Sequence, residues 1–187
     1  PLEGDGDFRS DECIKLLKQS DIVVTNPPFS LFREYLKQLV SYNKKILIIG
    51  SMNALKYANI FPLIKNNKIW LGVSSGAKTY IKPDKTEQIM GNTCWFTNID
   101  HGRRHQPLPL MTKAEVIKFV TKKPFQKYDN YDAIEVSQVK NIPSDYKGTI
   151  GVPISFLSKY SPEQFEIIGL GQGNLYRELT PRGLNKE

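Results

Sequence analysis

Residues 26–29 of the chain, Asn-Pro-Pro-Phe, have the types and order needed to hold a planar ring that carries an exocyclic amino group. Pro27 and Pro28 lack backbone N–H groups and stiffen the segment, so the carbonyl groups of Asn26 and Pro27 are free to accept hydrogen bonds. The side-chain oxygen of Asn26 is a further acceptor, and Phe29 offers a flat apolar face for stacking. Acceptors that hold both protons of an amino group pull its nitrogen toward sp³ geometry and expose its lone pair. Such a nitrogen is prepared to attack an electrophilic methyl group.

The elements on either side of this tetrapeptide decide between that chemistry and a plain turn. Residues 21–25 (DIVVT) form a short, apolar, β-branched run that is typical of a buried parallel strand. Ser30 is suited to begin a helix that continues to about residue 40. In an open α/β sheet, ligands bind outside the carboxyl ends of the strands, where residues 26–29 would lie. We therefore favour a functional role over the alternative, a proline-bounded turn with Asn26 as a local cap.

The remaining periodicity predicts a doubly wound α/β domain with a mainly parallel sheet, since strand and helix patterns alternate along the chain. Predicted strands cover residues 45–50, 68–73, 93–99, 133–136 and 165–168, and predicted helices cover residues 10–19, 53–64 (interrupted at Pro62) and 113–120.

The segment DIVVTNPPFSLFREYL (residues 21–36) resembles the catalytic motif of amino-group methyltransferases that use S-adenosylmethionine. Phe29, at the fourth position of the Asn-Pro-Pro-Phe motif, is similar to the residue at this position in the branch of the family that methylates the N6 atom of adenine in DNA. Four further segments look like EcoRI-type adenine-specific modification methylases: residues 4–17, 92–110, 131–136 and 151–157. The resemblance implies a Rossmann-like sheet and methyl transfer to the N6 atom of a flipped-out adenine in double-stranded DNA, within a restriction-modification system.

Particular residues take roles from this resemblance. The loop of Asn26, Pro27, Pro28 and Phe29 would hold the adenine. Asp7 matches the acidic residue that contacts the adenine ring of the cofactor, S-adenosylmethionine, and Phe8 would stack against that ring. Asp5 is equally placed in the GDGD sequence, and an ordinary turn is the alternative for both acids.

One part of the family pattern has no match in this chain. The family carries a glycine-rich cofactor loop and a ribose-binding acid upstream of the segment that resembles residues 4–9. The glycine cluster at residues 169–173 has no βαβ context and is expected to be a turn. We therefore expect this chain to be the C-terminal part of such a methyltransferase, without the strands that carry the cofactor loop. Alone, it should bind S-adenosylmethionine weakly or not at all. One edge of the strand at residues 21–25 should then be exposed. An upstream segment or separate chain would complete the site.

Charge and composition fit a DNA-binding protein. The net charge is +7, from 26 basic and 19 acidic residues. A predicted loop at residues 74–92 carries Lys78, Lys82 and Lys85, which could clamp a DNA backbone, and Arg103 and Arg104 could contact phosphates or a guanine edge. A solvated surface explains these residues equally well. We expect residues 1–112 to form the catalytic domain, including this loop, and residues 113–187 to form an α/β extension.

Several other classes receive no support. No apolar run is long enough for a membrane span, and two cysteines cannot form a disulfide framework, so a cytoplasmic location is expected. His101 and His105 have a spacing that could hold a metal, but no third ligand stands nearby, so no metal is predicted. Two alternatives stay open: a DNA-binding module without catalysis, and methylation of an RNA amino group or a protein amide.

DNA binding by this chain should weaken steeply with salt, because each lysine or arginine that contacts a phosphate releases counterions. Affinity measured between low and moderate salt concentration gives the slope. Replacing Lys78, Lys82 and Lys85 together should reduce that slope, whereas replacing Arg103 or Arg104 should also alter sequence preference. A flat salt dependence, or no binding at all, would contradict the polyanion-binding interpretation.

Overall fold

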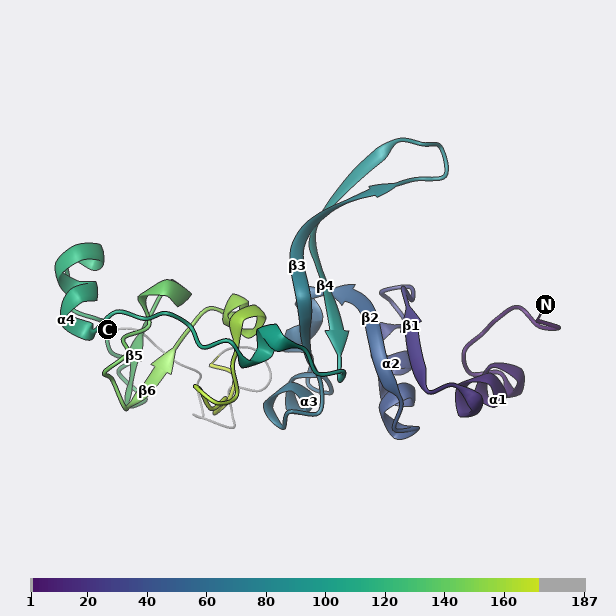
Figure 1. The fold of residues 1–187 in the computed structure, drawn as a ribbon, viewed down its shortest axis with the longest axis horizontal. Helices are drawn as coiled ribbons and strands as arrows, with labels where there is room; N and C mark the ends of the chain where they lie inside the picture. Colours follow the sequence, from purple (N-terminus) through teal and green to yellow (C-terminus); the bar gives the residue numbers. More distant parts are fainter. Residues whose placement is uncertain (1, 172–187) are drawn as a thin grey trace. The chain divides into compact units, whose positions relative to one another are not determined.

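The computed structural model describes residues 2–171, which form two compact units, one that ends at residue 101 and one that begins at residue 102 (Figure 1). Each unit is treated by itself below. Within residues 2–171, no helix combines the length and the apolar character that a membrane span requires.

The first unit is built on a four-stranded sheet with the order β1-β2-β4-β3. Its strands are β1 (Ile22–Thr25), β2 (Lys45–Ser51), β3 (Trp70–Ile81) and β4 (Glu87–Thr97). β1 pairs in parallel with β2, whereas β4 runs antiparallel to both β2 and β3. The α/β class is confirmed, but the prediction of a mainly parallel sheet is wrong. β3 and β4 are joined by a short turn, which allows only an antiparallel pair, because parallel neighbours need a crossover of a dozen or more residues.

The stretch at residues 74–92 is the outer part of this β3–β4 hairpin, so its prediction as a loop is also wrong. The backbone N–H of Lys85 donates to the Lys82 carbonyl, and the N–H of Lys82 donates to the Thr86 carbonyl, both at 2.9 Å. Pro83 presets the turn, and Lys85 takes a left-handed φ of 66°. The sequence Lys-Pro-Asp-Lys at residues 82–85 is typical of a turn, but the polar residues on either side of it led to the prediction of a long loop.

Four short helices accompany the sheet of the first unit: α1 (Asp11–Gln19), α2 (Phe32–Ser41), η1 (Met52–Lys56) and α3 (Phe61–Lys65). The cap predicted for α1 is confirmed, since the Ser10 hydroxyl accepts a hydrogen bond from the Cys13 N–H at 3.2 Å. Ser30 does not cap α2, which begins after Leu31 without a side-chain cap. The helix predicted over residues 53–64 is divided into η1 and α3, and Pro62 lies in the first turn of α3, where its missing N–H is tolerated.

The core of the first unit joins α2 to the sheet. Phe32, the first residue of α2, packs against Phe96 of β4, with ring centroids 4.9 Å apart. Both rings are at most 2% exposed. A Cβ on Gly50 of β2 would lie 2.6 Å from the Phe32 ring and 2.9 Å from the Phe96 ring. The absence of a side chain at residue 50 therefore makes room for this aromatic pair.

β1 lies at one end of the strand order, so one of its edges is unpaired among the residues described, as expected. The side chains of Ile22 and Val24 are 49% and 63% exposed. The prediction that this strand is buried on both faces is thus wrong for the chain as described, because no described element covers the face that carries Ile22 and Val24.

The second unit has little regular structure. Its elements are η2 (Gly102–His105), α4 (Lys113–Glu115), η3 (Val116–Thr121), β5 (Ala133–Glu135), η4 (Val139–Asn141), β6 (Thr149–Gly151) and η5 (Ile154–Lys159). β5 confirms the strand predicted near residue 133 and pairs in parallel with β6, which was not predicted. α4 and η3 together form the predicted helix near residues 113–120, with π turns in its second part.

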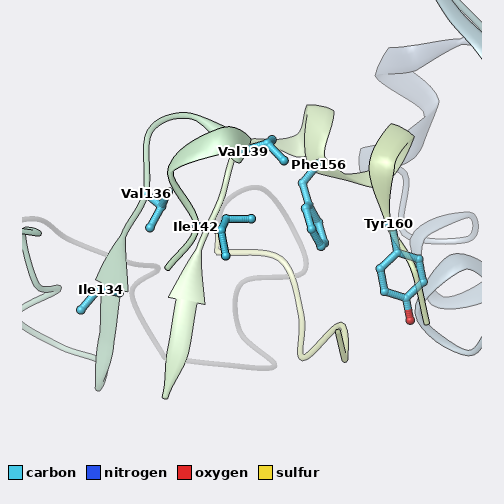
Figure 2. Packing of buried hydrophobic residues seen from close by; sticks show 6 residues of the cluster. All are labelled: Ile134, Val136, Val139, Ile142, Phe156 and Tyr160. Carbon is cyan, nitrogen blue, oxygen red and sulfur yellow. The ribbon is translucent and has the colours of Figure 1, made fainter. Parts of the chain in front are cut away.

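A small apolar core holds the second unit together. Figure 2 shows its buried members: Ile134, Val136, Val139, Ile142, Phe156 and Tyr160. The strand predicted at residues 165–168 is absent. Phe165 and Ile167 pack against this cluster instead of entering a sheet, which explains why they are apolar. Residues 172 and 173 of the glycine cluster lie outside the described residues, and the domain roles assigned to residues 1–112 and 113–187 stay predictions.

Gly50→Ala should lower the free energy of unfolding by about 1–3 kcal/mol, because the added methyl group overpacks the contact between Phe32 and Phe96. Gly91→Ala on β4 is the matched control, since a Cβ there meets no atom within 4 Å. Its effect should stay within about 0.5 kcal/mol. Urea unfolding of both variants measures the difference, and equal stability of the two would contradict the packing argument.

Candidate active site

The four residues of the Asn-Pro-Pro-Phe segment, named here the NPPF loop (residues 26–29), line one open pocket together with Ile49, Tyr80 and Met90. The pocket has a volume of about 440 Å³, within the size range of small-molecule sites. The loop directly follows β1, and Ile49 lies near the carboxyl end of the parallel neighbour β2. The site therefore lies where the sheet architecture predicts ligand binding.

Two hydrogen-bond acceptors of the NPPF loop have no protein donor. Among the residues described, no donor reaches the side-chain oxygen of Asn26, which is exposed, or the carbonyl of Pro27, which is a buried residue. Asn26 is exposed and caps no described N–H, which argues against the plain-turn interpretation. Phe29 is 38% exposed and contributes its ring to the pocket.

The end of the NPPF loop is fixed by the start of α2. The N–H of Leu31 donates to the Pro28 carbonyl at 3.0 Å, and the N–H of Phe32 donates to the Phe29 carbonyl at 3.4 Å. The buried Phe32 ring then anchors this turn against Phe96. Two loop carbonyls thus define the turn, while the carbonyl of Pro27 remains for a ligand.

Asp7 forms a bidentate ion pair with Arg9. Its Oδ2 lies 2.6 Å from Nη2 of Arg9, and its Oδ1 accepts from Nε at 2.9 Å and from the backbone N–H of Arg9 at 2.8 Å. The side-chain hydrogen bonds from Arg9, followed by the bond from its backbone, lower the pKa of Asp7 from 3.8 to about 2. Asp7 is therefore a carboxylate at neutral pH.

Phe8 attaches this acidic segment to α2. Its carbonyl accepts a hydrogen bond from Nε2 of Gln38 at 2.9 Å, and its ring packs on Tyr35 with centroids 4.8 Å apart. The guanidinium carbon of Arg9 lies 5.2 Å from the same ring centroid. Since α2 also follows the NPPF loop, a single helix supports both candidate segments.

The acidic segment does not fit the expected cofactor contact in this arrangement. Both oxygens of Asp7 accept from Arg9, so Asp7 could accept from an adenine amino group only if Arg9 released one of them. Asp5 accepts the N–H of Asp7 through Oδ1, and its Oδ2 has no donor among residues 2–171. The assignment of Asp7 and Phe8 to cofactor binding stays a prediction.

The predicted DNA-contacting residues are divided between the two units. Lys82 and Lys85 are exposed in the turn of the hairpin in the first unit. The backbone of Lys78 pairs with Met90, but its side chain lies outside what the structure describes. Arg103 and Arg104 belong to η2 of the second unit.

The two histidines are also in separate units and have different partners. Nε2 of His101 lies 2.9 Å from the Leu71 carbonyl oxygen. Nδ1 of His105 lies 2.6 Å from Oε1 of Glu163, and this contact is the main cause that lowers the pKa of Glu163. Within residues 2–171, no group of three or more potential ligands is placed to hold a metal.

Three pocket residues were not predicted: Ile49, Tyr80 and Met90. Tyr80 and Met90 were hidden by the interpretation of residues 74–92 as a loop. Recognising the turn at Pro83 would have placed them on paired strands, where side chains alternate between faces. Trp95 and Phe96 alternate along β4: Phe96 is buried in the core, and Trp95 is partly exposed.

Comparisons with known proteins match nearly the whole chain. The family model described as "Adenine-specific methyltransferase EcoRI" matches residues 1–186. The type II methyltransferase M.EcoRI of Escherichia coli is 50% identical over 96% of this chain and 59% of its own length. Type II methyltransferase M.MpnI of Mycoplasma pneumoniae is 42% identical over 90% of this chain, and M.MgeORF184P of Mycoplasma genitalium is 41% identical over 89%, each across 57% of the relative. The chain thus spans less than two thirds of these relatives, and no solved structure matches it.

Replacing Arg9 by Gln should raise the pKa of Asp7 from about 2 toward 3.8, because the hydrogen bonds of Arg9 are the main cause of the lowered value. A lowered pKa in the folded state stabilises the fold above pH 3.8, and this contribution disappears as the pH falls toward 2. NMR titration of the Asp7 carboxyl group measures the midpoint. Lys15→Gln, which removes an equal charge from α1, should leave it unchanged, and an unshifted midpoint in Arg9→Gln would contradict the ion pair.

Proposed function

The chain belongs to the family of EcoRI adenine-specific methyltransferases, and on that premise we propose that the complete protein is a type II DNA methyltransferase. It transfers a methyl group from S-adenosylmethionine to the N6 atom of an adenine in double-stranded DNA, as one part of a restriction-modification system in the cytoplasm. The observation that carries the proposal is the NPPF loop, which combines unpaired acceptors with an aromatic ring in one pocket.

The target adenine must leave the DNA duplex to reach this pocket, since its N6 atom is enclosed by the base stack. Unstacking and unpairing the base costs a few kcal/mol, which contacts with the extruded base offset. The N6 amino group donates its two protons to the Asn26 side-chain oxygen and the Pro27 carbonyl. The Phe29 ring packs on the base.

These contacts hold the N6 lone pair toward the methyl donor. S-adenosylmethionine would supply an electrophilic sulfonium methyl group, whose sulfur would keep the electron pair of the broken carbon–sulfur bond, and the proton released from N6 on methylation would pass to solvent water. Asn26 and Pro27 bind the reacting nitrogen without forming a covalent bond. Because the residues supply position and not a nucleophile, orientation accounts for most of the acceleration.

The cofactor site requires more than the residues described. β1, β2 and β3 run in one direction, β4 runs against them, and the outer edge of β1 is unpaired in residues 2–171. We infer that an upstream segment or a separate chain pairs with that edge, completes a Rossmann-like sheet and contributes the glycine-rich loop. The span of this chain, 59% of M.EcoRI, supports the inference. This chain alone should then bind S-adenosylmethionine weakly or not at all.

DNA affinity comes from basic residues outside the pocket. We assign phosphate contacts to Lys82 and Lys85, which are exposed in the hairpin turn, and the same role to Lys78, Arg103 and Arg104. These contacts position the duplex and supply affinity that does not depend on the target base.

Asn26→Ala in the complete protein should reduce methyl transfer on the order of 100-fold or more while DNA binding is largely preserved, since one preorganised contact at the reacting nitrogen is lost. Incorporation of labelled methyl groups into DNA and a binding titration measure the two effects. Asn66→Ala, an exposed asparagine that follows α3, is the control and should retain full activity. Near-normal turnover by Asn26→Ala would contradict the catalytic assignment.

A further inference from the structure

Arg33 and Tyr57 form a cation–π contact between the segments that follow two neighbouring parallel strands. Arg33 is the second residue of α2, which follows β1 and the NPPF loop, and Tyr57 comes directly after η1, which follows β2. The guanidinium carbon of Arg33 lies 5.0 Å from the centroid of the Tyr57 ring. Both segments leave the carboxyl ends of their strands, which is the edge of a sheet where ligands bind.

The guanidinium group of Arg33 has no acidic partner among the residues described, although Arg33 is exposed. The neighbouring Glu34 lies 3.5 Å from Arg9 instead. A cation in the first turn of a helix is also unfavourable, because the positive end of the helix dipole lies there. The contact with Tyr57 forms no hydrogen bond to an oxygen, so the five N–H donors of the arginine remain for an anion.

The backbone around Tyr57 fixes the ring on which Arg33 lies. The Tyr57 carbonyl accepts from the N–H groups of Ile60 and Phe61, each at 2.9 Å. Leu55, Ile60 and Phe61 are at most 2% exposed, so the chain is anchored in the core on both sides of Tyr57, which is itself 36% exposed. A ring on an anchored segment holds the guanidinium group in place before a ligand arrives, which reduces the entropy lost on binding.

The position of Arg33 relates this pair to the pocket. Arg33 follows Phe29 by four residues, and the bond from the Phe32 N–H to the Phe29 carbonyl shows that the loop enters α2 through a helical turn. Side chains four residues apart on such a turn are neighbours. Phe29 lines the pocket and Arg33 does not, so the arginine lies outside the base site, next to the wall that Phe29 forms.

We propose that Arg33 binds a backbone phosphate next to the extruded adenosine, with Tyr57 as the positioning residue that holds its guanidinium group. This inference rests on the proposed function. An extruded base stays joined to its strand through the phosphates on its two sides, so a base beside Phe29 brings one of them to the outside of that wall. The planar guanidinium group can donate two parallel N–H bonds to phosphate oxygens. Arg33 thus holds the flipped nucleotide itself.

The test removes one phosphate charge at a time. Sites methylated by the complete protein are first mapped by sequencing modified plasmid DNA, and duplexes are then made with an uncharged methylphosphonate linkage on the 5′ or the 3′ side of the target adenosine. At one of these linkages the methylphosphonate should weaken wild-type binding about 10-fold, and Arg33→Gln should weaken binding of the unmodified duplex by a similar factor. The two changes together should cost no more than either alone, because they remove the same contact.

Lys37→Gln is the matched control, because it removes an equal charge from α2 one helical turn farther along. It should keep the full sensitivity to the methylphosphonate. Tyr57→Phe should bind as wild type does, since it keeps the ring, whereas Tyr57→Leu should weaken binding several-fold and lose part of that sensitivity. Thermal unfolding of each variant verifies that the fold is intact.

Losses that add in full for Arg33→Gln at both linkages would overturn the phosphate assignment. Wild-type insensitivity to both linkages, or unchanged binding of the unmodified duplex by Arg33→Gln, would overturn it too. Equal behaviour of Tyr57→Phe and Tyr57→Leu would contradict the positioning role of Tyr57. If Asn26→Ala abolishes methyl transfer while these losses add, only this inference fails. Absence of any methylated site in the plasmid would instead overturn the proposed function.

Discussion

The contact between Phe32 and Phe96 over Gly50 is the packing constraint on which the rest of the first unit depends. The two rings join the start of α2 to β4, and the missing side chain at residue 50 lets them approach β2. The NPPF loop ends at Phe29, three residues before Phe32, and the N–H groups of Leu31 and Phe32 donate to its last two carbonyls. Because α2 also carries Tyr35 and Gln38, the same anchor positions the acidic segment at residues 7–9. A displacement of α2 would therefore move both halves of the proposed site.

The chemistry proposed for the NPPF loop depends on acceptors that receive no hydrogen bond from residues 2–171. A strand-to-helix turn commonly uses its asparagine to cap the helix, but α2 begins without a side-chain cap. The two prolines remove donors that would otherwise compete, and Asn26 remains exposed. The stability of the turn comes instead from buried aromatic packing farther along α2. Because the buried packing of Phe32, and not a hydrogen bond from Asn26, holds the turn, the polar atoms of the loop stay unpaired while the turn stays fixed.

The hairpin connects the two requirements of an enzyme that would act on a base in DNA. Its turn exposes Lys82 and Lys85, which suit a phosphate backbone, and one of its faces brings Tyr80 and Met90 to the pocket. Under the proposed function, this one hairpin would contact the DNA backbone through its turn and the base site through one of its faces. The basic residues of η2 belong to a separate unit, so the positive charge of the chain is not gathered on one element.

The sequence by itself determined the parts of this protein that depend on local chemistry. The Ser10 cap, the strand at residues 22–25, the strand at residues 45–51 and the acceptors of the NPPF loop all follow from side-chain type and short-range periodicity. The family likewise follows from the motif and its flanking segments, and the match over residues 1–186 confirms it.

Only the tertiary structure decided how the strands pair and what completes the pocket. The turn at Pro83 could be recognised in the sequence, but the pairing of β4 with β2 joins residues far apart in sequence, and only the structure shows it. Tyr80 and Met90 could likewise be placed on paired strands from that turn, whereas their position beside the NPPF loop is a result of tertiary structure. The ion pair of Asp7 with Arg9 is a further case: the sequence places two charges near each other, but only side-chain geometry shows that both carboxylate oxygens are occupied.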